Sequence, residues 1–417
     1  MKVLFACHRV PYPPKRGGKI RPFNIIRHLT EQGHQVTVAS LARTQREAEE
    51  AADLAKHCER VLVEVISDPV AWARMLAWLP TPNPSSFAYF RSPALARRVN
   101  AATAETSFDL AFAHCSSAAP YVADARVPLK ILDFGDMDSQ KWREYVAYKH
   151  FPLSAGYRLE AAKLERAERR LAQKFDLCTC TTRAELQSLR DLGVSSPTDW
   201  FPNGVDGTFF EPEADYDPDL IAFVGRMDYY PNQQGVAMFC SEVFPRLRAQ
   251  RPGVRFQIVG ADPPPSVREL AKIPGVSVTG SVPDVRSYIT RAAMTVAPLA
   301  IARGTQNKIL EAMAMGVPVV CSLQAAGGVD AVAGEHLLTA ANADEYVSAV
   351  GRILDSKELR ATLAEKGRAR VLSHHAWRSS MLRLDGLIAG ALGRQANGPV
   401  PNALAPSVKF QASRRSG

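Results

Sequence analysis

One short segment, residues 304–321 (GTQNKILEAMAMGVPVVC), constrains the fold more than any other part of this sequence. Apolar residues such as Ile309 and Met313 recur at helical spacing, and Gly316 predicts the end of the helix. The β-branched run at 317–320 is typical of a buried parallel strand. Because parallel strands are joined by crossover helices, a helix that leads directly into such a strand predicts an α/β domain.

Two ionisable side chains lie near the start of this predicted helix. Lys308 and Glu311 are three residues apart and therefore share one helix face. They lie near backbone N–H groups and the positive end of the helix dipole, both of which attract anions. A nucleotide sugar offers a diphosphate to the cation and ribose hydroxyls to the carboxylate. The alternative is a buried helix with a solvated Lys–Glu pair, and the rest of the chain favours the anion site.

The chain is long enough for two domains. Its 417 residues exceed the usual size of one hydrophobic core, and an apolar content of 46% is sufficient to build two. Strand and helix patterns alternate along the chain and restart after FPNGVDGTFFEPEADYDPD, a stretch rich in Pro, Gly, Asn and Asp. We therefore predict two doubly wound, Rossmann-like α/β domains that face a cleft, with ligands at the carboxyl ends of their strands.

The same patterns predict the boundaries of these domains. The expected parts are a first domain at 1–200, a linker at 201–219, a second domain at 220–375, a helix at 376–392 that can cross back to the first domain, and a tail at 393–417. The tail has the composition of a disordered segment, and we assign no chemistry to it. A long charged helix is expected at 157–174 within the first domain.

The net charge of +9 permits an anionic partner, and basic residues are concentrated near the amino terminus. Residues 1–46 contain one acid, Glu31. They contain nine basic residues: Lys2, Arg9, Lys15, Arg16, Lys19, Arg21, Arg27, Arg43 and Arg46. No zinc-finger spacing or aromatic-plus-basic RNA-binding pattern accompanies them, which argues against nucleic acid. A diphosphate substrate or an anionic membrane surface fits better.

Seven scattered cysteines without a CxxC pair, together with the absence of a signal-peptide pattern, predict a cytoplasmic protein. No apolar run approaches the ~20 residues that span a bilayer. Residues 70–90 nevertheless contain several aromatic side chains, among them Trp72, Trp78 and Phe90, with arginines nearby. This composition favours the head-group interface of a membrane. An ordinary helix that is buried against its own domain explains the pattern equally well.

Gly17 and Gly18 separate the first predicted strand from the first predicted helix. Glycines at such a turn let the backbone approach an anion closely. Three basic residues surround them: Lys15, Arg16 and Lys19. The turn is not GxGxxG and no acidic residue ends the second predicted strand, which argues against a dinucleotide-dependent oxidoreductase.

Six segments together resemble the retaining glycosyltransferases of family 4, which share the two-domain architecture of many nucleotide-sugar enzymes. They are YPPKRGGKIRPFNIIRHLTEQGHQVTV, FDLAFAHCSSAAPYV, FPNGVDGTFF, FVGRMDYYPN, GSVPDVRSYI and GTQNKILEAMAMGVPVV, and they lie within residues 8–321 in the family's order. More narrowly, three segments resemble the sugar transferases of PEP-CTERM exopolysaccharide systems: ILDFGDMDSQKW, FVGRMDYYPN and GTQNKILEAMAMG. The resemblance implies the GT-B architecture, an acceptor-side first domain, a nucleotide-sugar-binding second domain, and no metal or other cofactor.

Carried over by position, the resemblance implies roles for individual residues. Arg226 would contact the donor diphosphate, Glu311 the ribose, and His114 the donor sugar. The donor-binding assignments are Gly17, Gly18, Arg226, Gly304, Thr305, Asn307, Lys308 and Glu311, and the catalytic assignments are His114, Arg226 and Lys308. Three loop acids (Asp133, Asp136 and Asp138) are expected to face the cleft, and because such acids are often turn formers we assign no metal to them.

Two positions depart from the family's pattern. Arg303 stands where the family usually has the first of two glutamates, the one that addresses the donor sugar. Pro231 stands where a lysine usually follows the Arg226 position by five residues. We expect Lys308 to supply the missing charge, because it lies one turn from Glu311 at the helix mouth.

These observations predict a metal-independent, retaining hexosyltransferase of cell-surface glycan or exopolysaccharide biosynthesis. It would move a hexose from a nucleotide diphosphate sugar to a lipid-linked or saccharide acceptor, as a peripheral protein on the inner face of the cytoplasmic membrane. Two alternatives are a nucleotide-sugar epimerase or hydrolase on the same fold, and a non-catalytic saccharide- or membrane-binding relative.

Overall fold

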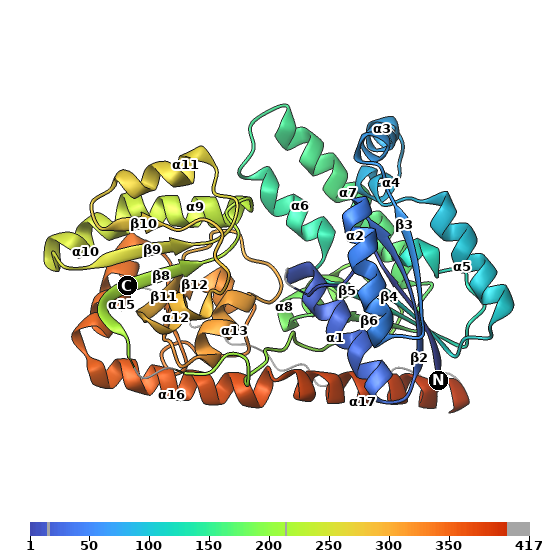
Figure 1. The fold of residues 1–417 in the computed structure, drawn as a ribbon. Coiled ribbons are helices and arrows are strands. Elements are labelled where there is room, and N and C mark those ends of the chain that lie inside the picture. The colour runs from blue at the N-terminus through green and yellow to red at the C-terminus, as the bar shows by residue number, and fades with distance from the viewer. Residues whose placement is uncertain (15–16, 213–214, 398–417) are drawn as a thin grey trace, which may run out of the picture.

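Two α/β domains, each built on one parallel sheet, form the structure (Figure 1), a computed structural model that describes residues 1–14, 17–212 and 215–397. This architecture confirms the prediction of two doubly wound domains. Lys15 and Arg16, part of the predicted basic run, and most of the predicted tail lie outside the described residues.

The first sheet has seven strands within the described residues, in the order β3-β2-β1-β4-β5-β6-β7. The strands are β1 (Lys2–Cys7), β2 (Gln35–Ala42), β3 (Arg60–Val65), β4 (Leu110–His114), β5 (Leu129–Gly135), β6 (Leu177–Cys180) and β7 (Thr198–Trp200). The helices are α1 (Gly17–Glu31), α2 (Gln45–Glu50), η1 (Ala51–His57), α3 (Asp68–Trp78), α4 (Ser85–Tyr89), α5 (Pro93–Glu105), η2 (Ala119–Tyr121), α6 (Asp138–Val146), α7 (Leu153–Ala172) and α8 (Arg183–Asp191).

The second sheet has six strands in the described part of the chain, in the order β10-β9-β8-β11-β12-β13. The strands are β8 (Asp217–Val224), β9 (Arg255–Val259), β10 (Val276–Val278), β11 (Ala292–Ala297), β12 (Val319–Ser322) and β13 (Leu338–Ala340). The helices are α9 (Tyr230–Met238), η3 (Phe239–Val243), α10 (Phe244–Gln250), α11 (Pro265–Arg268), η4 (Glu269–Lys272), α12 (Arg286–Thr290), α13 (Asn307–Ala314), α14 (Leu323–Ala326), α15 (Ala343–Asp355) and α16 (Lys357–His374).

The first sheet is buried on both faces, as parallel sheets require. In β1 the side chains alternate, so that Phe5 packs into the core on one face of the sheet and Leu4 into the core on the other. This two-sided burial explains why β1 reads as an uninterrupted apolar run. The second domain has a single large core that includes Phe223, Phe256 and Ile309.

The last described helix, α17 (Trp377–Asn397), returns to the first domain. Met381, Leu384 and Ile388 pack into the same core as Phe5. His28 of α1 lies 2.9 Å from Asp385. Figure 1 shows α16 and α17 running along one side of both domains, so that the carboxy-terminal helix ties the two together.

Several predicted boundaries were wrong. The helix predicted at 376–392 spans Trp377–Asn397 and extends into the predicted tail, because the periodic apolar contacts with the first domain outweigh the composition that follows. β8 begins at Asp217, inside the predicted linker, since its backbone pairs with the strand beginning at Ala292. The helix predicted at 157–174 begins four residues earlier, at Leu153, and ends at Ala172.

Candidate functional site

The two sheets reverse their strand order at equivalent points. In the first sheet the switch lies between β1 and β4, and in the second it lies between β8 and β11. Parallel α/β sheets bind ligands at the carboxyl ends of the strands at such points. The predicted residues follow these strand ends: Gly17 comes after β1, His114 ends β4, Arg226 comes after β8, and Gly304 comes after β11.

The first turn of α13 carries the predicted cation. The Lys308 ammonium lies 2.6 Å from Oδ1 of Asn232 and 4.4 Å from the centre of the Phe223 ring. It also lies against the backbone at Gly225, where an added Cβ would come within 2.9 Å of Lys308 Nζ. Burial lowers the pKa of Lys308 to about 7, and the nearby Glu311 only partly offsets this effect. The Lys308 ammonium therefore lies beside Asn232. Asn232 directly follows Pro231, which occupies the position where the family usually has a lysine.

Glu311 lies on the same face of α13, as the spacing predicted. Burial raises the pKa of this carboxyl to about 7, and Lys308 works in the opposite direction. Ionisation of either group near neutral pH therefore costs free energy, because the protein does not supply a full set of polar partners to Lys308 or to Glu311. A ligand with a diphosphate and hydroxyl groups would supply those partners.

Two more predicted donor residues have buried polar atoms without partners. Within the described residues, Thr305 Oγ1 and Asn307 Oδ1 have no hydrogen-bond partner. Asn307 also faces Gly17 across the domain boundary, since an added Cβ on Gly17 would lie 3.9 Å from Asn307 Nδ2. A Cβ on Gly18 would meet nothing within 4 Å. The beginnings of α1 and α13 therefore face each other with space and unmet hydrogen-bonding capacity between them.

Arg226 forms ion pairs with two acidic neighbours in this structure. Its guanidinium binds Asp228 at 2.8 Å and also contacts Asp262. Asn232 Nδ2 donates to the Arg226 carbonyl at 2.7 Å, so one asparagine holds both Arg226 and Lys308. Sequence reasoning missed Asn232, because an asparagine after a proline is typical of an ordinary turn.

His114 belongs to a buried charge network. Its Nδ1 lies 2.8 Å from Asp133 Oδ2, and Arg21 of α1 binds both carboxylate oxygens of Asp133 at 2.8 Å. Thr179 also donates to Asp133, at 2.9 Å. Burial alone would raise the pKa of Asp133, but Arg21 and then His114 outweigh it and hold that pKa well below its usual range. The network fixes the orientation of the His114 ring at the end of β4.

The three loop acids do not share one role. The prediction that Asp133 faces the cleft was wrong, because its side chain is fully buried and bound to Arg21. Asp138 accepts a hydrogen bond from Ser116 at 2.9 Å. Asp136 lies against Gly304 of the other domain, where an added Cβ would come within 1.9 Å of its carboxylate, and Gly304 has a φ of 63°. Only glycine fits there, for both reasons.

Arg303 stands where the family has a glutamate that addresses the donor sugar, but its side chain contacts the first domain. Its guanidinium binds Glu144 of α6 at 2.7 Å, Glu185 of α8 at 2.8 Å and Ser188 at 3.0 Å. These contacts join the two domains beside the cleft. The departure from the family's glutamate thus has a structural consequence that the sequence did not reveal.

The loop after β1 also contains unmet polar groups. Among the described residues, His8 Nδ1 and Arg9 Nε are buried without hydrogen-bond partners. Burial lowers the pKa of His8, and Arg9 and His114 add to the effect. His8 therefore lies in the electrostatic neighbourhood of His114, on the first-domain side of the cleft. Sequence reasoning assigned no role to His8.

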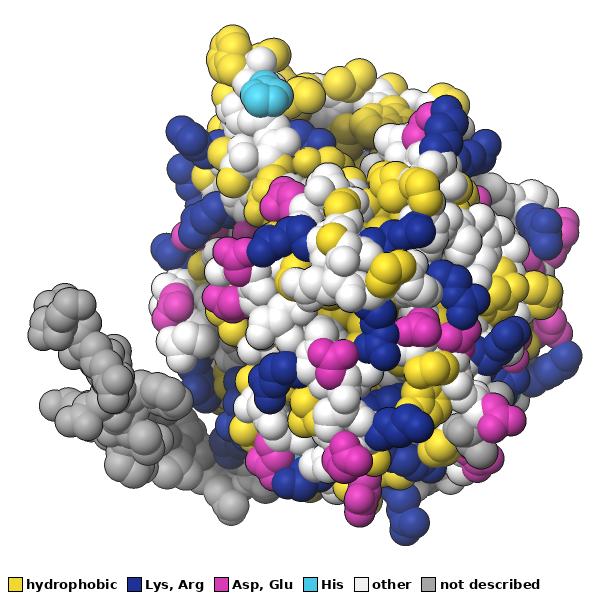
Figure 2. All heavy atoms as spheres, turned by 90° about the vertical axis from the view of Figure 1, so that its left-hand side faces the viewer, with side chains coloured by type: hydrophobic (Ala, Val, Ile, Leu, Met, Phe, Trp, Pro, Cys, Tyr) yellow, Lys and Arg dark blue, Asp and Glu magenta, His cyan; other side chains and the backbone are white. Residues whose placement is uncertain are grey.

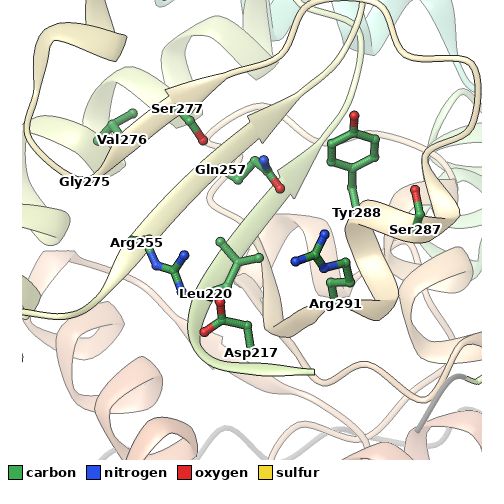
Figure 3. Close-up of a pocket in the computed structure, with 10 residues that line it drawn as sticks. All are labelled: Asp217, Leu220, Arg255, Gln257, Gly275, Val276, Ser277, Ser287, Tyr288 and Arg291. Carbon is green, nitrogen blue, oxygen red and sulfur yellow. Dashed lines mark hydrogen bonds and ion pairs between the residues drawn. The ribbon is translucent and has the colours of Figure 1, made fainter. Parts of the chain in front are cut away.

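One cavity in the second domain lies away from all these residues. It has a volume of about 470 Å³ and lies in the second domain near the amino ends of β8 and β9 (Figure 3). Its lining includes Gln257, Tyr288 and Arg291. Because the predicted residues lie at the opposite, carboxyl ends of the strands, this cavity is not the candidate site. A second cavity of about 440 Å³, which includes Asp262 and Gly280, adjoins the Arg226 cluster.

The described residues contain no cluster of three or more His, Cys, Asp and Glu side chains arranged to hold a metal ion. No helix in the described ranges is long and apolar enough to cross a membrane.

The predicted aromatic segment divides into two parts. Trp72 and Leu76 of α3 are exposed, at 53% and 58%. Trp78, Phe87 and Phe90 are only partly accessible. A second exposed apolar group lies at the turn between α6 and α7. Figure 1 places α3 and the α6–α7 turn at the same end of the molecule, and Figure 2 shows apolar side chains at that end, above a face where basic and acidic side chains are mixed.

Two family models match the chain, one for each domain. Residues 16–209 match the model described as Glycosyltransferase Family 4, and residues 218–356 match the model described as Glycosyl transferases group 1. A curated relative is the MMP alpha-(1->4)-mannosyltransferase of Mycolicibacterium hassiacum. It is 28% identical over 243 residues, which are 55% of this chain and 57% of the relative. The match thus spans little more than half the length of that relative.

Solved structures with the same architecture are more distant in sequence. Sucrose-phosphate synthase from Thermosynechococcus elongatus has a TM-score of 0.69 at 17% identity, with 94% of this chain and 100% of that chain covered. HepE from Anabaena, solved in complex with UDP, has a TM-score of 0.67 at 15% identity and the same coverage. At these identities the likeness establishes the fold, which is the GT-B fold.

Proposed function

This chain carries a Family 4 domain and a group 1 domain of glycosyltransferases on the GT-B fold, and on that premise we propose that it transfers a hexose from a nucleotide diphosphate sugar to a lipid-linked or saccharide acceptor. We further propose that the anomeric configuration is retained and that no metal is required. The resemblance to exopolysaccharide-associated transferases supports an acceptor in cell-surface glycan synthesis.

One observation carries the proposal: the unmet polar groups at the mouth of α13. Lys308 and Glu311 are half-buried with pKa values shifted toward their neutral forms, and Thr305 and Asn307 have polar atoms without partners among the described residues. A structural lysine and glutamate would be expected to pair with the protein around them. Here the missing partners are those that a diphosphate and a ribose provide.

The chemistry follows from where charge develops. As the glycosidic bond loosens, negative charge grows on the leaving diphosphate, and preorganised donors stabilise it. The Lys308 ammonium and the backbone amides at the start of α13 and α1 would fill this role. In this free state Arg226 is bound to Asp228 and Asp262, so the donor would have to compete for it. His114, oriented by Asp133, would lie toward the transferred sugar.

The donor can be identified by thermal shift with UDP, GDP, ADP and their common sugars. The solved complexes of HepE with UDP and with UDP-glucose make the uridine series the first to test, and the mannosyltransferase relative adds GDP-mannose. Ligand at about 100 times its dissociation constant adds about 2.7 kcal/mol to stability. A Glu311→Gln variant should show a smaller shift, and no shift of the wild type with any nucleotide would contradict the proposal.

Transfer itself is tested with the identified donor, with and without a saccharide acceptor. We expect release of the nucleoside diphosphate to depend on acceptor, with an axial or equatorial anomeric linkage that matches the donor by proton NMR. Rapid acceptor-independent loss of donor would favour the hydrolase or epimerase alternative. Activity that persists in EDTA is the expected result for a metal-independent enzyme.

The same proposal includes a location on an anionic membrane surface. Its support is the pairing of two exposed apolar groups at one end of the first domain, on α3 and at the α6–α7 turn, where Phe151 is 85% exposed. Exposed apolar groups of this kind are typical of interaction surfaces. A lipid-linked acceptor would be presented at that surface.

A further inference from the structure

The loop after β1 holds an arginine without a counterion. Within 1–14, 17–212 and 215–397, no hydrogen bond or ion pair is found for the Arg9 guanidinium, and its Nε is buried. Glu47 is the carboxylate that most raises the pKa of Arg9, but it already accepts from the Arg43 amide at 2.9 Å and lies 3.7 Å from Lys19. A partly buried cation without a partner is costly unless it has a ligand.

A second arginine stands next to it. Arg9 and Arg43 follow the paired strands β1 and β2, and the Val10 amide donates to the Leu41 carbonyl at 3.1 Å, which keeps the two loops together. After burial, Arg43 is the group that most lowers the pKa of Arg9. Arg43 is held in place by Asp68, 2.8 Å away, at the start of α3. Two guanidinium groups of like charge, one of them unpaired, make a site that favours an anion with several oxygens, since guanidinium groups bind phosphate in a bidentate way.

Contacts lead from this arginine pair to the exposed face of α3. The Tyr89 hydroxyl also binds Asp68, and Tyr89 acts electrostatically on Arg9. The Tyr89 ring lies 6.1 Å from that of Trp72, which is 53% exposed. His8 and Arg9 directly follow Cys7, which pairs with His114 where β1 lies beside β4. Because β1 lies between β2 and β4, an anion at Arg9 would have Arg43 and α3 on the β2 side and the proposed sugar site at His114 on the β4 side.

We propose that Arg9, flanked by Arg43, binds a phosphate of the acceptor, and that the exposed face of α3 carries the acceptor's apolar chain. The acceptor is then a saccharide linked to a prenyl diphosphate, with its sugar directed over His8 toward His114. The binding of such a molecule follows from the geometry of the first domain alone. Its role as acceptor rests on the proposed function.

Direct binding tests the site without any need for turnover. Farnesyl diphosphate, farnesol and inorganic pyrophosphate are titrated into the full chain by calorimetry. We expect farnesyl diphosphate to bind at least tenfold more tightly than either of the other two, because only it has both the anion and the chain. Equal binding of pyrophosphate would overturn the lipid part of the proposal, and equal binding of farnesol would overturn the phosphate part.

Variants locate the site on the protein. Arg9→Gln should weaken farnesyl diphosphate binding at least tenfold. Arg9→Lys should weaken it less, because lysine keeps the positive charge and loses only the bidentate geometry of the guanidinium group. The matched control is Arg97→Gln on α5, an exposed arginine that forms no hydrogen bond or ion pair with the described residues, and this variant should bind as the wild type does. Lys308→Met should also leave binding unchanged. If Lys308→Met loses binding and Arg9→Gln does not, the ligand occupies the donor site and the proposal is wrong.

Transfer separates this proposal from the proposed function. The wild type is compared on two acceptors with the same saccharide, one on a prenyl diphosphate and one on a neutral alkyl chain. We expect Arg9→Gln to raise the KM for the diphosphate acceptor at least tenfold, with little change for the neutral acceptor or the donor. Transfer that is equally efficient to both acceptors in the wild type would refute the phosphate site and leave glycosyl transfer intact.

Discussion

At the residue scale, Lys308 lies in the first turn of α13 and has a lowered pKa. We predict that Lys308→Met lowers the rate of transfer by about 10²–10³, the usual cost of removing one preorganised donor at a developing charge. Steady-state kinetics with the identified donor measures this loss. Because burial lowers the pKa of Lys308, the lysine destabilises the folded state at neutral pH, and the variant should be at least as stable by chemical unfolding. A variant that transfers at a rate within a few-fold of the wild type would rule out this role.

The same lysine predicts a pH dependence of donor binding. A bound diphosphate raises the Lys308 pKa above its free value of about 7, so the complex holds more protons than the free protein above that pH. Donor affinity should therefore fall as pH rises above about 7. Glu311 titrates in the same range, with its pKa raised to about 7 by burial. We would measure nucleotide binding in Glu311→Gln, in buffers of different ionisation enthalpy, and expect net proton uptake. Proton release would contradict the prediction.

Arg21 is the residue whose loss should cost most in stability. It is a buried partner of Asp133, and breaking a buried ion pair from one side typically costs about 3–5 kcal/mol. Arg21→Met should lower the free energy of unfolding in urea by that amount. Because the Asp133 pKa is held low in the folded state, the stability that this carboxylate contributes is present above its ordinary pKa and lost only in strong acid. Adding Asp133→Asn to Arg21→Met should recover part of the loss, and an additive result would argue against the pair.

At the scale of elements, α3 shows how one helix can serve two purposes. Its inner side is tied to the domain through Asp68, which binds Arg43 and Tyr89, and its outer side leaves Trp72 and Leu76 exposed. Arg91 stacks 5.6 Å from the centre of the Trp78 ring, which makes Trp78 a structural residue and directs the test to Leu76 instead.

We predict that the protein sediments with anionic liposomes at low salt and is released at ~1 M salt. Each basic group near the surface contributes about 1 kcal/mol, and this attraction is screened within a Debye length of ~3 Å at that salt. Trp72→Ala combined with Leu76→Ala should abolish sedimentation and keep donor binding. Protein that stays in the supernatant at low salt would instead favour a soluble acceptor.

At the scale of the whole molecule, Arg303 controls how the domains meet. Its partners Glu144 and Glu185 lie in the first domain, and Asp136 of that domain lies against Gly304 next to it. Burial would lower the pKa of Arg303, but Glu185 and Glu144 raise it overall. Without this arginine, the two domains lose its ion pairs with Glu144 and Glu185.

Arg303→Ala should therefore shift the free protein toward a more open form. Small-angle X-ray scattering should show a larger radius of gyration, and Arg303→Glu should increase it further by charge repulsion. The double variant Arg303→Glu, Glu144→Arg should restore compactness in part. Arg251→Ala is a suitable control, because Arg251 binds Asp219 and Asp355 within one domain. Equal scattering from all of these variants would mean that the contact does not hold the domains.

Features that depend on local spacing were read correctly from the sequence. Lys308 and Glu311 share a face of α13, and β1 and β12 form as buried parallel strands, because helical and strand periodicity act over a few residues. The alternating strand and helix pattern, which restarts after a break in the chain, was enough to predict two domains of the GT-B fold. The position of Gly17 at the start of α1, after β1, followed from the same regularity, whereas its position opposite Asn307 was set by how the two domains pack.

Pairings between distant residues were decided by the tertiary structure alone. The sequence placed Arg21 only in a basic run, yet folding brings it to Asp133, 112 residues away, and thereby removes that acid from the cleft. Arg303 was a departure from a pattern until the fold placed Glu144 and Glu185 beside it. A charge carries no mark of its partner in the sequence, because the partner is set by which elements the packing of two cores brings together. Periodicity therefore determined the elements of this protein, and packing determined which of their charges are paired and which, such as Arg9, have no partner among the described residues.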